Sequence, residues 1–230
     1  MAWQPPKGMD EYLKATELCD CNNVELQRTA KEIVKDTQTP KEAALKIFYC
    51  VRDQIKFGMD YADVKASQTL KKGLGYCFTK PNLQIALLRA VRIPARCHYV
   101  HLPKELLKDM APGFAYRRMP AAIGHAWCEC YLSAKWIACE ALFDEPFYEA
   151  RLRTGSLTKE KTPTIDWDGE TDLILPKLSV AKDVGTFPSL DDLLKEAGKG
   201  GEGTPPRRGF FGWFVCFLAN RRLNKIRKGS

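Results

Sequence analysis

Residues 73–81, GLGYCFTKP, decide the fold. In this stretch a turn that contains Gly73 and Gly75 is followed by Cys77 and then by a strongly apolar helix. The helix is predicted from the apolar residues between positions 83 and 91, and Ile93-Pro94 ends it. Such a helix is typical of a central, buried position. Unpaired backbone N–H groups and the positive end of the helix dipole favour a thiolate, so Cys77 is a candidate nucleophile. The alternative is a small buried thiol with a structural role.

Helices are predicted on the N-terminal side of this stretch and strands on its C-terminal side. The predicted helices cover residues 10–18, 23–34 and 39–55. The predicted strands cover residues 95–102, 125–132 and 135–143, followed by an irregular connection over 154–186 and a short helix over 189–196. Helices followed by an antiparallel meander predict an α+β fold, with the nucleophile helix packed on an antiparallel sheet.

A hairpin is predicted where residues 125–132, HAWCECYL, alternate with a period of two. If residues 133–134 form a two-residue turn, the pairing brings Glu140 and Asp144 to the face of the sheet that carries His125. Both acids are then diagonal neighbours of His125, within reach of a carboxylate–imidazole hydrogen bond. A shift of one residue in register would move both to the opposite face.

These residues supply the parts that thiol catalysis needs. His125 takes the proton of Cys77, a carboxylate of Glu140 or Asp144 holds the ring in one tautomer, and the thiolate attacks an amide or ester carbonyl. A thioester on Cys77 results, which water resolves in hydrolysis and a second amine resolves in acyl transfer. Backbone N–H groups at the helix start, including that of Cys77, are candidates for binding the oxyanion.

The same residues carry a resemblance to a known family. Gly73-x-Gly75-x-Cys77, the apolar helix that leads to residues 93–96, then 125–129 (HAWCE) and 136–140 (WIACE) occur in the order of the transglutaminase-like superfamily core. The resemblance covers residues 40–150. Residues 167–169 and 183–192 are similar to a little-characterised single-domain prokaryotic-type branch of the superfamily.

The resemblance implies a papain-like α+β fold with a Cys–His–Asp triad, carried here by Cys77 and His125. The family pattern has an Asp four residues after Trp136, and this sequence has Glu140 in that place. Glu140 is expected to be the third member because its strand position matches, and Asp144 remains the alternative. The implied activity is that of a cysteine protease, peptide amidase or transglutaminase-like acyltransferase on a peptide or protein amide, with hydrolysis favoured. The rival hypothesis is a non-catalytic peptide-binding module on the same fold.

Nine cysteines and three histidines raise the question of a metal site. No C-x-x-C pair appears twice, so no zinc site can be composed, and we expect neither a metal nor another cofactor. His98 and His101 are expected to be structural. The odd number of cysteines, and no leader pattern in residues 1–14, predict reduced thiols in a cytoplasm.

The chain divides by composition at residues 199–209, KGGEGTPPRRG, which are typical of a linker. The expected organisation is a transglutaminase-like domain over residues 1–198 with its core at 40–150, this linker, and a basic, aromatic-rich helix over 210–230. Hydrophobic residues make up 45 % of the chain and charged residues 28 %, which excludes an intrinsically disordered protein.

The C-terminal segment holds most of the excess charge. The formal net charge is +8, and residues 205–230 contain seven basic residues and no acidic one. Two interpretations stand: the apolar side of this helix docks on the domain, or residues 207–228 bind a membrane surface or a protein partner, as in a membrane-docked adaptor. The second would make the protein cytoplasmic and peripheral to a membrane. No motif for specific nucleic-acid binding is present.

Overall fold

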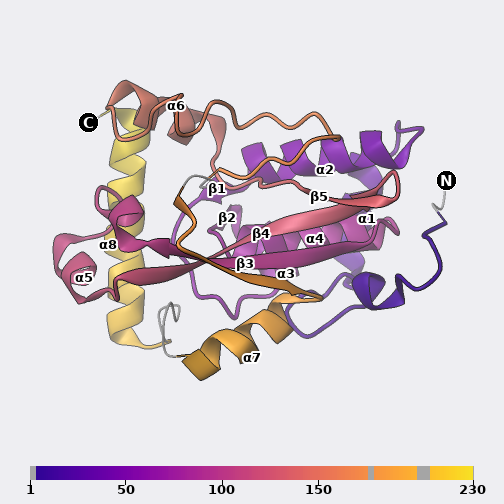
Figure 1. The fold of residues 1–230 in the computed structure, drawn as a ribbon, viewed down its shortest axis with the longest axis horizontal. Helices are drawn as coiled ribbons and strands as arrows, with labels where there is room; N and C mark the ends of the chain where they lie inside the picture. The colour runs from indigo at the N-terminus through magenta and orange to yellow at the C-terminus, as the bar shows by residue number, and fades with distance from the viewer. Residues whose placement is uncertain (1–3, 176–178, 201–207, 230) are drawn as a thin grey trace.

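The computed structural model describes residues 4–175, 179–200 and 208–229 (Figure 1). It has the expected α+β class: helix α4 packs against a four-stranded antiparallel sheet in the order β5-β4-β3-β6. The strands of this sheet are β3 (Ala95–Pro103), β4 (Ala122–Leu132), β5 (Lys135–Ala138) and β6 (Lys182–Phe187). Two short strands, β1 (Lys56–Phe57) and β2 (Leu74–Gly75), pair in parallel.

The helices before and within the sheet are α1 (Val24–Ile33), α2 (Pro40–Gln54), α3 (Ala66–Lys72), α4 (Thr79–Ala90) and α5 (Gly113–Arg118). Those after the β4–β5 hairpin are α6 (Glu145–Arg153), α7 (Leu190–Gly200) and α8 (Phe210–Lys228). Two 3-10 turns, η1 (Asp10–Leu13) and η2 (Lys104–Leu107), complete the described elements. None of the described helices is long and apolar enough to cross a membrane.

Helix α4 is the central helix that the apolar residues predict, and all of its residues except the last are buried. It begins at Thr79, earlier than predicted, because Pro81 falls in the first turn, where no backbone N–H is needed. Its buried Gln84 donates to the carbonyl of Cys139 at 2.9 Å, next to the β4–β5 hairpin. The helix therefore positions the turn that carries Cys77 against the sheet.

The β4–β5 hairpin has the predicted two-residue turn and register. Residues 133–134 have φ angles of 49° and 63°, which suits a tight hairpin turn, and Glu129 pairs with Ala138. Strand β5 is shorter than the predicted 135–143. It ends because the following residues leave β4 for another segment, where the N–H of Glu140 donates to the carbonyl of Leu173 at 3.1 Å.

Three other expectations need correction. Residues 10–18 form only the short η1, because the chain beyond it is bonded elsewhere: the N–H of Leu18 donates to Asp191 at 3.1 Å. Strand β6 lies in the segment expected to be an irregular connection. A bulge at Val184, between the residues that pair with Tyr99 and Val100, and the exposure of β6 hide its alternation. Helix α7 runs on to Gly200, and residues 201–207 of the expected linker lie outside the described residues.

Helix α8 stands at one end of the sheet, beside α5 and α6 (Figure 1). Its buried side is a row of mostly small residues: Gly212, Cys216, Ala219 and Leu223. Three polar side chains bind it to the domain. The Nε of Arg222 donates to the carbonyl of Asp109 at 2.5 Å. Asn220 exchanges hydrogen bonds of 2.7 and 2.9 Å with the backbone of Met59, and Arg227 binds the carboxylate of Asp144 at 2.6 and 3.0 Å. One side of α8 is therefore docked on the domain.

We expect Arg227→Met to lower the free energy of unfolding by about 3 kcal/mol, because it leaves the buried Asp144 carboxylate without its charged partner. Urea denaturation of the whole chain measures this. The matched control is Arg221→Met, an exposed residue of the same helix, with an expected change within about 0.5 kcal/mol. Equal effects of the two substitutions would contradict the docking of α8 through Arg227.

The pH dependence of that difference has a definite sign. Burial raises the pKa of Asp144, but Arg227 and the N–H of Phe57 outweigh burial and hold the pKa below its ordinary value of 3.8. A depressed folded-state pKa gives stability that is present above the unfolded pKa and is lost as the pH falls. The gap between wild type and Arg227→Met should therefore close below about pH 4.

Candidate active site

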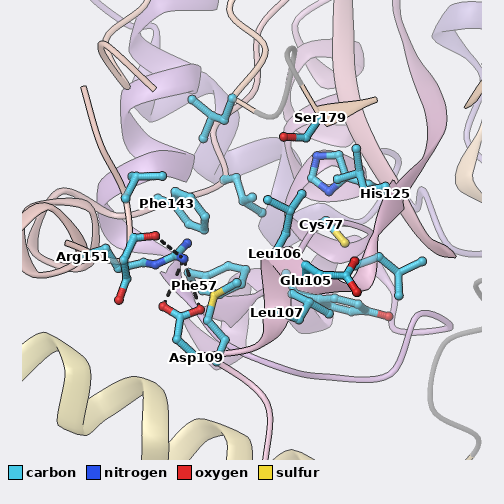
Figure 2. Close-up of a pocket in the computed structure, with 18 of the residues that line it drawn as sticks. Phe57, Cys77, Glu105, Leu106, Leu107, Asp109, His125, Phe143, Arg151 and Ser179 are labelled. Atoms are coloured by element: carbon cyan, nitrogen blue, oxygen red, sulfur yellow. Dashed lines mark hydrogen bonds and ion pairs between the residues drawn. The ribbon is translucent and has the colours of Figure 1, made fainter. Parts of the chain in front are cut away.

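Cys77 and His125 lie together at one end of a cavity (Figure 2). Cys77 occupies the turn between β2 and α4 and is half-buried, and its sulfur lies 4.0 Å from the carbonyl oxygen of Gly124. The side chain of Cys77 lies beside the His125 ring (Figure 2), close enough to contribute to the raised pKa of the ring. The start of the central helix and strand β4 thus bring thiol and imidazole into contact, as their separate sequence signals predict.

Glu140 is the acid that contacts His125. Nε2 of His125 lies 2.8 Å from Oε1 of Glu140, which leaves Nδ1 for Cys77. The other carboxylate oxygen, Oε2, accepts the N–H of Leu175 at 2.7 Å, and Glu140 is 2 % exposed. Both oxygens of the buried carboxylate are therefore engaged, which fixes the plane of the carboxylate and with it the ring of His125.

Asp144 is turned to other partners. Its carboxylate accepts the N–H groups of Phe57 (2.7 Å) and Phe147 (3.3 Å) and binds Arg227. The expectation that it neighbours His125 assumed that strand β5 continues to residue 143. Because β5 ends at Ala138, Asp144 instead caps helix α6, and of the two candidate acids only Glu140 contacts the ring among the described residues.

The pKa of His125 is raised from 6.5 to about 10. Burial by itself lowers the pKa of the ring, because it disfavours the charged imidazolium. The charge of Glu140, together with its hydrogen bond to the ring and the neighbouring Cys77 side chain, outweighs burial and raises the pKa. The ring thus has a high proton affinity, which suits a group that must take the proton of a neighbouring thiol.

Gly124 and Gly75 allow neighbouring segments to pack closely against the backbone near His125 and Cys77. A Cβ atom at Gly124 would lie 2.5 Å from the hydroxyl of Tyr99, on the neighbouring strand β3. A Cβ atom at Gly75 would lie 2.7 Å from the hydroxyl of Thr79, which accepts the N–H of Tyr76 at 3.0 Å. The absence of side chains at these two positions lets β3 and the start of α4 pack tightly around Cys77 and His125.

A second acid–imidazole cluster lies on the same sheet, and sequence reasoning missed it. His98 binds Glu129 at 2.7 Å and Asp183 at 2.9 Å, and Arg96 binds the other oxygen of Glu129 at 2.7 Å. The ring of Trp127 stacks on His98 with centroids 4.4 Å apart. The signal was present, since Arg96 pairs directly with Glu129 across β3 and β4. With both ring nitrogens engaged, His98 is structural, as expected.

The cavity beside Cys77 has a volume of about 460 Å³ and a mostly apolar lining. Its wall is built from distant segments, including Phe57, the η2 loop with Leu106, and Val215 of α8. Arg151 and Asp109 lie at the end away from Cys77, where Nη2 of Arg151 contacts the carboxylate at 3.1 and 3.3 Å (Figure 2). Arg151 and Asp109 pair with each other, and Glu105 and Lys161 also line the cavity, so charged groups border a mostly apolar site.

The cysteines other than Cys77 do not form a metal centre in the part of the chain that the structure describes, where no three His, Cys, Asp or Glu side chains are grouped as ligands. All nine are free thiols. Cys128, Cys130 and Cys139 are buried on the core side of the hairpin, and burial contributes to raising the pKa of each. They fill the core as small apolar groups.

Comparison with known proteins gives a family and a fold. A model of the transglutaminase-like superfamily matches residues 27–141. A solved structure from Cytophaga hutchinsonii, provisionally named a cysteine protease, is similar with a TM-score of 0.53 and 17 % identity, over 82 % of this chain and 50 % of that one. At this identity the likeness shows the fold alone, and the present chain spans about half the length of that protein.

Two further structures are more distant. A provisionally named protease from Parabacteroides distasonis has a TM-score of 0.38 and 15 % identity, over 57 % of this chain and 25 % of that one. The transglutaminase of red sea bream has a TM-score of 0.36 and 13 % identity, over 93 % of this chain and 32 % of that one. None of the curated proteins matches the sequence.

We expect Glu140→Gln to lower the pKa of His125 by about 1 to 3 units, because it removes the facing negative charge. The pKa in the native chain is raised, so the imidazolium persists above neutral pH and is lost as the pH rises through about 10. In the variant this loss should come at lower pH. An NMR titration of the labelled histidine rings measures both proteins, with His98 as the internal control because its partners are Glu129 and Asp183. An unchanged His125 titration would contradict the assigned pair.

Proposed function

The chain belongs to the transglutaminase-like superfamily, and on that premise we propose that it is a cysteine-dependent acyl-transfer enzyme. It cleaves an amide bond of a peptide or protein through a thioester on Cys77. The observation that carries this proposal is the unbroken line of contacts from the Cys77 thiol through the His125 ring to the buried carboxylate of Glu140. Acyl transfer through a thiol needs these three groups in this order.

The proposed reaction has two halves. The His125 ring holds the proton of the Cys77 thiol as an imidazolium stabilised by Glu140, and the thiolate sulfur attacks the carbonyl carbon. When the C–N bond breaks, His125 gives that proton to the leaving amine and a thioester remains. A water molecule then attacks the thioester while His125 takes its proton. The acid product leaves as the C–S bond breaks, which restores the thiolate beside the His125 imidazolium.

The tetrahedral intermediates that form before and after the thioester each carry an oxyanion, and we propose that it binds at the start of helix α4. The N–H of Lys80 donates to the carbonyl of Tyr76 at 2.9 Å. The backbone N–H groups of the residues just before Lys80 have no acceptor within the helix. These include the N–H of Cys77. Donors of this kind, aimed at the developing charge, contribute a large part of the rate in acyl transfer.

The cavity supports an apolar group on the acyl side of the scissile bond. A cavity of about 460 Å³ is large enough for a sizeable apolar group, and Cys77 and His125 line it together with Leu106 and Phe143. A charged side chain would lose its hydration there, and the cationic Arg151 is already paired with Asp109. The proposed acyl acceptor is water, in line with the protease name given to the Cytophaga hutchinsonii protein of the same fold.

Activation of Cys77 is tested by alkylation with iodoacetamide at neutral pH, followed by mass spectrometry of the Cys77 peptide. His125→Ala is expected to slow the alkylation of Cys77 by about tenfold or more, because the base that takes the thiol proton is lost. The matched control is His101→Ala, on strand β3, which should leave the rate within a factor of about two. The comparison is made at one cysteine, since the other eight are buried and would label slowly for that reason alone.

An unchanged alkylation rate in His125→Ala would contradict the enzyme hypothesis. It would favour the rival hypothesis, a peptide-binding module that keeps the fold without the chemistry.

The acyl-side preference is tested with peptide amides that differ only in the residue before the scissile bond. We expect kcat/KM to be about tenfold or more higher for Leu or Phe than for Asp or Lys, because only the apolar groups enter the cavity without losing hydration. Leu106→Asp should reduce this preference. The mass of the product, acid or new amide in the presence of an added amine, identifies the acceptor. Equal rates for apolar and charged residues would contradict the assigned role of the cavity.

A further inference from the structure

The outward side of helix α8 is apolar in its first half. The buried row from Gly212 to Leu223 faces the domain, and the opposite side carries large aromatic residues. Five of the six exposed large hydrophobic side chains in the described part of the chain lie here: Phe210 (82 %), Phe211 (61 %), Trp213 (54 %), Phe214 (39 %) and Phe217 (49 %). We call these five residues the aromatic patch. Exposed apolar groups gathered on one helix mark an interaction surface.

Helix α5 extends the aromatic patch. The ring of Phe114 lies 6.3 Å from that of Phe211 and 6.5 Å from that of Phe214. Arg117 and Arg118, at the end of the same short helix, are exposed. The patch is therefore a surface shared by two helices, with cations at its edge.

The second half of α8 carries cations on the same outward side. Its exposed basic residues on this side are Arg221, Lys225 and Lys228, which we call the cationic row. Residues 210, 214, 217, 221, 225 and 228 follow one another at intervals of three or four, so three residues of the aromatic patch share one helix face with the cationic row. Phe211 and Trp213 flank this face. Helix α8 contains no acidic residue. The face is thus apolar along one half and positive along the other.

The contacts that dock α8 use neither group. Asn220, Arg222 and Arg227 make the polar contacts with the domain, and small residues make the close packing. Removal of the aromatic patch or the cationic row would therefore leave these contacts in place. The outward face is free to bind something else.

We propose that this face binds an anionic lipid surface, with α8 lying flat along it. Aromatic rings on one side of a surface helix enter the boundary between headgroups and acyl chains, and cations beside them attract acidic lipid headgroups. The absence of acidic residues from α8 matches a negative surface along its whole length. An acidic protein would meet the cations equally well, but the row of protruding aromatic rings suits the interface of a bilayer.

This arrangement would place the cavity at the lipid surface. Val215, on α8 between the exposed Phe214 and the buried Cys216, lines the cavity that contains Cys77. The helix that touches lipid would thus also be a wall of the site. The binding itself does not depend on the proposed acyl-transfer activity.

The test is sedimentation of the full chain with vesicles of phosphatidylcholine, with and without phosphatidylserine. We expect binding to the anionic vesicles, weakened by added salt because the lipid charge is screened. The double substitution Trp213→Ser with Phe217→Ser, and separately Arg221→Gln with Lys225→Gln, should each lower the vesicle affinity about tenfold or more.

Matched controls come from helix α1. Val24→Ser removes an apolar residue that is more exposed (82 %) than Trp213 or Phe217. Arg28→Gln with Lys31→Gln removes two exposed charges. These controls should bind as the native chain does. The alkylation rate of Cys77 in each variant reports that the site remains folded, and it should not change in any of them.

Failure of the native chain to bind anionic vesicles would overturn the proposal and leave an acidic protein partner as the explanation of this face. Binding that the α1 controls weaken as much as the α8 variants would also overturn it. Failure of His125→Ala to slow the alkylation of Cys77 would contradict the proposed function and leave the lipid binding standing.

Discussion

The hydrogen bond between Nε2 of His125 and the carboxylate of Glu140 holds together two parts of the protein that are separate in sequence. A carboxylate with 2 % exposure needs hydrogen-bond partners for both oxygens, and here these are the ring and the N–H of Leu175. The first contact ties strand β4 to the chain after β5. The second ties that chain to the segment around residue 175. Imidazole orientation and chain path therefore depend on one buried side chain.

A second set of buried polar contacts joins the start of α4 to the end of α2. Lys80, three residues after Cys77, is fully buried, and its Nζ donates to the carbonyls of Ile55 (2.6 Å) and Arg52 (3.2 Å) at the end of α2. Burial lowers the pKa of Lys80 to about 7, although the charge of Asp144 opposes the shift. Asp144 in turn binds Arg227 of α8. The last helix of the chain is thus connected through charged groups to the turn that presents Cys77.

Much of the site could be predicted because its signals are local. The position of Cys77 before an apolar helix, and the alternation of residues 125–132, each follow from a short stretch of sequence. The hairpin register followed from the length of one turn, and the observed pairing of Glu129 with Ala138 confirms it. Asp144 could not be separated from Glu140 in this way, because the end of β5 depends on backbone bonds to Leu173, far along the chain. The partners of His98 were missed for a related reason, since Asp183 comes from the unpredicted strand β6.

The sequence alone determined the class of fold, the thiol and imidazole, and the face of the hairpin on which the acid must lie, because periodicity and turn length fix which side chains share a face. The tertiary structure alone decided that Asp144 caps a helix and holds Arg227, that Phe57, Leu106 and Val215 enclose one cavity, and which side of α8 is left exposed. These features arise where segments distant in sequence meet, and burial there, unlike local spacing, depends on the packing of the whole chain.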